Sequence, residues 1–183
     1  MKKVVYLFVI VAGFVISSCE SSTEATAEAE GTTAELGRGQ SGVVDESSNP
    51  NIVQVASGSK DHTTLVVAIK AAGLVDALSN AGPFTVFAPT NAAFDKLPKG
   101  TVEDLLKPEN KDKLENILGY HTYVGSLKTD YMVDGNEYDM VFGGKVKITK
   151  QGDKTFVNGS EVLASIQTSN GWIHVIGDVL LPK

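Results

Sequence analysis

Few residues of this chain have the types and spacing that catalytic or metal chemistry requires. The 183 residues contain three histidines, His62, His121 and His174, and none of them stands three or four positions from another. Because helical zinc sites need such a spacing, the histidines predict no metal centre. The chain also lacks the G-x-S-x-G turn of a nucleophilic serine and the glycine-rich P-loop of phosphate binders. We therefore expect no enzyme activity, no metal and no cofactor.

Acidic and glycine-rich segments do not alter this expectation. Glu103-Asp104 lies on the flank of a predicted helix, where a solvated face is more common than a general acid–base pair. Residues 130–139 hold four acids around Gly135 without the residue order of a calcium loop. Residues 37–42 match the dinucleotide-binding pattern G-x-G-x-x-G. No hydrophobic strand precedes them and no helix follows, so we interpret them as linker.

The single cysteine carries the clearest chemical signal. Lys2 and Lys3 precede an uncharged apolar run that ends at residues 16–19, Ile-Ser-Ser-Cys. This is the pattern of an export signal, and the run is too short to span a membrane. Residues 16–19 resemble the lipobox of bacterial lipoproteins, with isoleucine and serine in place of the commonest leucine and glycine or alanine. The resemblance implies a diacylglyceryl group and a further acyl chain such as palmitate on Cys19. An ordinary secretory signal with an incidental cysteine is the alternative.

The composition divides the chain into three parts: a signal peptide at 1–18, an acidic tether with lipidated Cys19 at 19–50, and a globular domain at 51–183. The tether has seven acidic residues, one arginine and no aromatic residue, which gives it a net charge of −6. It can bury too little apolar area to offset its ordering entropy, so we expect it to be disordered. The whole chain also carries −6, and the two lysines of the signal therefore leave the domain at −2. A near-neutral domain behind an acidic tether argues against nucleic-acid binding.

The domain shows helical patterns in its first half and strand patterns in its second. Helices are predicted at 52–56 with Asn51 as cap, at 63–72 with Asp61 as cap and Gly73 as the end, and at 74–78, 102–106 and 111–119. Aromatic, β-branched or alternating residues predict strands at 84–88, 145–149 and 172–176. Without a regular βα alternation, these elements indicate the α+β class.

Three segments of the domain together resemble the fasciclin-like domain. They are residues 82–94 (GPFTVFAPTNAAF), Tyr120-His121 after a helix, and residues 170–176 (NGWIHVI) with their closing VLLP at 179–182. Their order and separation match, and the resemblance covers about residues 51–182. It implies a β-sandwich or wedge of about seven strands with several packed helices. One position departs from the family pattern, because Gly177 stands where an acid is usual, and Asp178 is the candidate replacement.

The residues of these segments have first a structural interpretation. Pro89 cannot donate to a strand ladder and should end its strand, and Thr90 can cap a helix that begins at Asn91. In the last strand, Ile173 and Val175 should share one face while His174 lies on the other. The side chains that we expect to hold the fold are Thr85, Phe87, Pro89, Thr90, Asn91, Phe94 and His174.

Tyr120 and His121 are the candidate binding residues, because this motif is linked to integrin binding in animal members of the family. The alternative, which we favour, is a packed ring beside a hydrogen-bonded imidazole. The leading functional hypothesis is a surface-displayed, membrane-anchored module for cell adhesion or for contact with an extracellular or envelope protein or polysaccharide. Its expected location is the cell envelope, outside the cytoplasm, at the outer membrane or cell surface. The alternative is a carrier of a small hydrophobic ligand such as a carotenoid, and an enzyme with a novel site is the third class.

Overall fold

The computed structural model describes residues 49–182. The predicted signal peptide, Cys19 and all but the last two residues of the predicted tether lie outside this range, so these assignments stay predictions. Among the described residues, no helix is long and apolar enough to cross a membrane.

The described residues form six α-helices and seven strands. The helices are α1 Ile52–Gly58, α2 Thr63–Ala72, α3 Val75–Ser79, α4 Asn91–Asp95, α5 Thr101–Leu105 and α6 Lys111–Tyr120, with 3-10 turns η2 Lys60–His62, η3 Pro108–Asn110 and η4 Thr129–Tyr131. The strands are β1 Phe84–Pro89, β2 Thr122–Val124, β3 Glu137–Asp139, β4 Lys145–Gln151, β5 Lys154–Val157, β6 Ser160–Thr168 and β7 Gly171–Ile176. The predicted α+β class and the strand number are confirmed.

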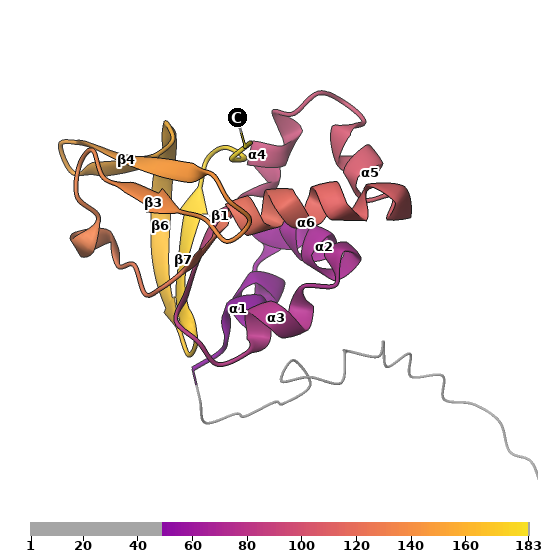
Figure 1. Ribbon diagram of the computed structural model, residues 1–183, viewed down its shortest axis with the longest axis horizontal. Helices are drawn as coiled ribbons and strands as arrows, with labels where there is room; N and C mark the ends of the chain where they lie inside the picture. Colours follow the sequence, from indigo (N-terminus) through magenta and orange to yellow (C-terminus); the bar gives the residue numbers. More distant parts are fainter. Residues whose placement is uncertain (1–48, 183) are drawn as a thin grey trace, which may run out of the picture. The chain divides into compact units, whose positions relative to one another are not determined.

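The seven strands form one sheet in the order β2-β1-β7-β6-β5-β4-β3. β1 and β7 pair in parallel, and every other pair of neighbours among these strands is antiparallel. In Figure 1, β3 and β4 run across β6 and β7, while the helices lie on the far side of β1 and β7. The sheet therefore curls over itself, as the predicted wedge requires.

Two hydrophobic cores lie on the two faces of β1 and β7. The helix-side core joins α1, α2, α3 and α6 to Val86, Ala88, Ile173 and Val175. The sheet-side core joins Phe87 and Ile176 to apolar residues of the end of α6, of β4 and β5 and of the connecting segments, namely Tyr120, Leu127, Met132, Met140, Val146, Ile148, Val157 and Leu180. Alternate residues of a strand face opposite sides, and this alternation gives β7 the two faces predicted for it.

The helix ends test the predicted caps. Asn51 caps α1 through a capping box with Gln54, and Gly73 ends α2 in the left-handed conformation, with a φ of 74°, as expected. The predicted cap of α2 by Asp61 is wrong. Asp61 lies within η2, which runs directly into α2, and the side chain of His62 at the N-cap position makes no capping hydrogen bond to the helix.

A distant residue supplies the cap that α2 lacks locally. Asn91 Oδ1 accepts the backbone N–H of Thr64 at 3.0 Å, and Asn91 Nδ2 donates to the carbonyl of Lys60 and to Thr63 Oγ1. The first turn of α4 thus satisfies a free donor of α2 and locks the two helices together.

Candidate functional site

The candidate pair Tyr120-His121 lies where α6 ends and the chain enters β2. Both side chains are buried, with exposed fractions of 4% for Tyr120 and 2% for His121. Their polar atoms point to different neighbours, and each residue borders a different concavity. Partners could reach these side chains only through those concavities.

His121 joins the end of α6 to the C-terminal segment. Its Nδ1–H donates to the carbonyl of Ile117 at 2.8 Å, and its Nε2 accepts the N–H of Leu180 at 2.9 Å. A carbonyl can only accept and a backbone N–H can only donate, so these partners define the neutral tautomer. Burial lowers the pKa of His121 to about 4, against a smaller opposing effect of the Ile117 carbonyl.

Tyr120 faces the opposite side and supports the strands. Its hydroxyl donates to the carbonyl of Lys145 at 2.8 Å and accepts from Asn158 Nδ2 at 3.0 Å. The hydroxyl lies beside an open groove of about 620 Å³ over β3, β4 and the β5–β6 turn. We refer to this space as the strand groove.

His121 borders an apolar cavity of about 310 Å³ among α2, α5, α6 and the C-terminal segment. The lining is almost wholly hydrocarbon and comprises Leu65, Ala68, Pro89, Phe94, Leu97, Pro98, Thr101, Leu105, Leu114, Ile117, Leu118, His121, Val179 and Leu181. We call it the helix cavity. A hydrocarbon wall favours an apolar occupant over water.

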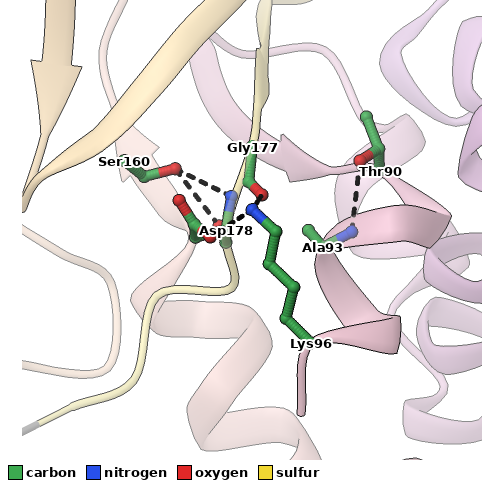
Figure 2. A network of polar contacts seen from close by, with 6 residues as sticks. All are labelled: Thr90, Ala93, Lys96, Ser160, Gly177 and Asp178. Atoms are coloured by element: carbon green, nitrogen blue, oxygen red, sulfur yellow. Dashed lines mark hydrogen bonds and ion pairs between the residues drawn. The ribbon is translucent and has the colours of Figure 1, made fainter.

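A group of polar contacts, which we call the clasp, joins the residue after α4 to the residues after β7 (Figure 2). Phe94, Leu97 and Val179, close to it in the sequence, line the helix cavity. Lys96, directly after α4, donates through Nζ to the carbonyl of Gly177 at 2.7 Å and to Asp178 Oδ1 at 2.6 Å. The N–H of Asp178 donates to Ser160 Oγ at 2.9 Å. Asp178 therefore provides a carboxylate for Lys96, although Gly177 occupies the position where the family usually has an acid. Because both charged side chains are largely exposed, the ion pair itself stabilises little.

The first motif residues lie in β1. Thr85 is fully buried, donates to the carbonyl of Gly125 at 2.7 Å and accepts the N–H of Leu127 at 2.9 Å. Phe87 is also fully buried, and Pro89 is the last residue of the strand, as predicted. Thr85 thus holds the segment that follows β2 against β1.

The other motif residues lie around α4 and in β7. Thr90 caps α4 by accepting the N–H of Ala93, as predicted and as Figure 2 shows. Phe94 is only partly buried and borders the helix cavity. His174 donates from Nε2 to the carbonyl of Leu127 at 2.7 Å, and its ring lies 5.6 Å from that of Phe87.

Two asparagines outside the candidate list join elements that are distant in the sequence. Asn170 accepts the N–H of Ile52 and donates to the carbonyls of Leu78 and Asn80, which ties α1 and α3 to β7. Asn158 accepts the N–H of Lys147 and donates to Tyr120. The sequence marked both only as the first residue of an Asn-Gly pair.

Comparison with known proteins agrees with this geometry. The model of the fasciclin domain matches residues 60–182. The chain belongs to the fasciclin domain family. The resemblance predicted from the three segments is therefore confirmed, and the matched range contains Tyr120, His121 and both concavities.

Relatives of this fasciclin domain come from bacteria and animals. Protein sll1483 of Synechocystis sp. is 52% identical over 132 residues, which is 72% of this chain and 73% of the relative. Cell surface glycolipoprotein MPB83 of Mycobacterium bovis is 39% identical over 109 residues, or 60% of this chain and 48% of that protein. A fasciclin domain pair from the insect cell adhesion molecule Fasciclin I superimposes with a TM-score of 0.66 at 16% identity, covering 72% of this chain and 51% of that one. The likeness to that pair shows a shared fold.

Proposed function

We propose that this fasciclin protein is a membrane-anchored binding module that is displayed at the cell surface and acts in adhesion or in contacts with matrix or envelope components. Family membership supports this proposal, since one relative is named a cell surface glycolipoprotein and one solved structure comes from a cell adhesion molecule. The lipobox-like residues 16–19 would supply the anchor on Cys19. Each lipid methylene that is buried in the membrane contributes about 0.8 kcal/mol, so two or more acyl chains hold a protein firmly at the membrane.

The observation that carries the proposal is a segment with unusual exposure. From the last residue of β2 to the turn before β4, five large apolar side chains are exposed, namely Val124, Tyr131, Val133, Val141 and Phe142. Much of this segment lies on the side of β1 and β7 that is opposite the helices (Figure 1), while Phe142 at the β3–β4 turn contacts the end of α6. Exposed apolar side chains are normal when scattered singly, whereas contiguous ones mark interaction sites, and we propose that these five contribute to one such surface.

An attachment assay tests the adhesive role. Cells that produce the full-length protein should attach to a matrix-coated surface better than cells that lack the gene. Cells that produce Cys19→Ser should resemble the deletion strain, because the protein would no longer be held at the surface. Equal attachment of all three strains would refute the proposal.

Lipid on Cys19 is a separate part of the proposal with its own measurement. Fatty-acid labelling and membrane fractionation of the full-length protein should show lipid in the envelope fraction. Cys19→Ser should remove the label and release the protein from membranes. Label that persists in Cys19→Ser would place the lipid elsewhere.

The helix cavity favours a second candidate, a carrier of a small hydrophobic ligand such as a carotenoid. Its volume of about 310 Å³ is at the small end of the about 300–1,000 Å³ typical of ligand sites, so a long pigment would extend beyond it. Organic extraction of the full-length protein should then release a lipophilic compound. Ala68→Phe, which fills the cavity, should reduce this yield. Val67→Phe on the exposed side of the same helix is the matched control. An equal yield from both variants would exclude the cavity as the ligand site.

A further inference from the structure

The strand groove combines polar groups of both signs with one exposed aromatic ring. Its volume of about 620 Å³ lies within the range of small-molecule and oligomer sites. The lining residues are Tyr120, Glu137, Phe142, Gly143, Gly144, Lys145, Lys147, Thr149, Asn158, Gly159 and Pro182. The proposed adhesive role does not explain why polar groups of both signs and an aromatic ring lie together here, and the helix cavity is a separate, apolar space.

Phe142 stands at the tip of the β3–β4 hairpin and is held there. The turn is closed by Gly143 N–H donating to the carbonyl of Met140 at 3.0 Å, and Val141 N–H donates to the carbonyl of Thr122 at 3.0 Å. The ring rests on α6 at Gly119, where an added Cβ would lie 1.6 Å from Phe142 Cδ2. The side chain nevertheless remains 51% exposed. An apolar ring is thus offered to the groove by a backbone that is already ordered.

The floor of the groove is equally fixed. Asn158 has a φ of 50° in the Asn-Gly turn between β5 and β6, a conformation that asparagine tolerates. Its side chain accepts from the N–H of Lys147 at 2.8 Å and donates to the Tyr120 hydroxyl at 3.0 Å. Since the hydroxyl also donates to the carbonyl of Lys145, its hydrogen is committed, and a remaining lone pair can accept from a ligand. A rigid floor loses little entropy when a ligand binds.

The charges around the groove nearly balance. Lys147 pairs in register with Glu137, and Lys145 pairs with Asp139. Lys145 Nζ lies 3.9 Å from Glu137 Oε2 and 3.8 Å from Asp139 Oδ1, and Lys147 forms no ion pair within residues 49–182. The groove therefore offers the ammonium groups of Lys145 and Lys147, the Glu137 carboxylate and the Thr149 hydroxyl. A ligand with many groups that both donate and accept matches this lining better than an ion of one sign.

We propose that the strand groove binds a neutral hexose polysaccharide, with the apolar face of one sugar ring stacked on Phe142 and its hydroxyls bonded to Glu137, Lys147 and Thr149. A sugar ring has an apolar C–H face and a rim of hydroxyls that donate and accept, and the groove presents the complement of both. This inference rests on the proposed binding function and names the chemical class of its partner.

Affinity electrophoresis of the full-length protein in detergent tests the assignment. The gels contain soluble neutral glucan, galactan or mannan, with alginate and heparin as polyanions. At least one neutral polysaccharide should retard the protein, and Phe142→Ala should weaken that binding roughly tenfold, because it removes the stacking surface. Thr149→Val, which keeps the shape and removes the hydroxyl, should weaken it several-fold. Leu163→Ala removes an apolar side chain of β6 that is 56% exposed and does not line the groove, and it should leave binding unchanged.

Melting temperatures of the variants, measured alongside, show that losses of binding are not losses of folding. Retardation by polyanions alone, or by no polysaccharide, would overturn the assignment. Binding that survives both Phe142→Ala and Thr149→Val would also overturn it. If cells attach through this protein although it binds no neutral polysaccharide, the glycan site is refuted and the adhesive role stands. Polysaccharide binding by the protein, together with equal attachment of cells with and without it, would refute the adhesive role and leave the glycan site standing.

Discussion

Acid should destabilise this fasciclin domain through His121. The neutral ring donates from Nδ1 to Ile117 and accepts at Nε2 from the N–H of Leu180. A proton added to Nε2 would turn this acceptor into a donor that faces another donor at 2.9 Å in a buried site. Burial and the lost bond therefore both oppose the charged ring.

The size of the effect follows from the two pKa values. In the unfolded chain the imidazole titrates near 6.5, whereas in the folded domain its pKa is lowered to about 4. The unfolded state thus binds more protons between these values, so stability falls as the pH drops from 6.5 towards 4. The full difference corresponds to about 3 kcal/mol, of which about 2 kcal/mol is lost between pH 7 and pH 5. This is a large part of the about 5–15 kcal/mol that a domain of this size usually has.

His174 provides the comparison. Burial lowers its pKa as well, but its Nδ1 contacts the hydroxyl of the exposed Ser165 at 2.8 Å. A hydroxyl can rotate from donor to acceptor, so protonation of His174 leaves no pair of facing donors. The pKa of His121 should accordingly be the lower of the two.

Urea unfolding at pH 7, 6 and 5 measures the loss above the range in which most carboxylates titrate. His121→Gln should lower stability at pH 7 and reduce the further loss at pH 5 by about 2 kcal/mol, whereas His174→Gln should reduce it less. NMR titration of the imidazoles reads the pKa values directly. A His121 ring that titrates above pH 6, or an equal acid loss in His121→Gln, would refute the reasoning.

Three substitutions test the packing and the clasp by thermal or urea unfolding. Gly171→Ala should cost at least about 2 kcal/mol of stability, because the residue has a φ of 148° and its added Cβ would lie 1.8 Å from the carbonyl oxygen of Phe84. A near-native melting temperature would contradict the parallel β1–β7 contact. Phe87→Ala should cost about 3–5 kcal/mol of stability, since the ring is fully buried within the sheet-side core. A loss below about 1 kcal/mol would contradict this burial. Asp178→Asn should cost less than about 1 kcal/mol, because its ion pair with Lys96 is exposed, and a loss above 2 kcal/mol would show that the clasp stabilises more than its geometry indicates.

The candidate pair shows how far sequence reasoning could reach in the site. The position of Tyr120-His121 after a helix predicted a packed ring beside a hydrogen-bonded imidazole, and the structure places both side chains in that arrangement. Their binding role stays a prediction. What the sequence could not indicate is that the two neighbours border opposite concavities, because this depends on the curl of the sheet and on the C-terminal segment.

Features whose physical causes act within a few residues could be predicted from the sequence alone. The caps at Asn51 and Thr90, the end of α2 at Gly73 and the two faces of β7 follow from local hydrogen bonds, backbone freedom and the strand period. The prediction of Asp61 as a cap was wrong because a capping residue was sought next to α2 in the sequence. The Thr64 N–H in the first turn of α2 instead donates to Asn91, which belongs to α4.

Which elements contact one another depends on the folded chain as a whole. Asn91 caps α2 from 27 positions away, and β7 enters the sheet in parallel beside β1, so that the last strand separates the two cores. The strand groove likewise exists only because Tyr120, the Phe142 hairpin tip and the Asn158 turn converge. Such contacts depend on how the whole sheet closes, and no local preference of a residue encodes that closure.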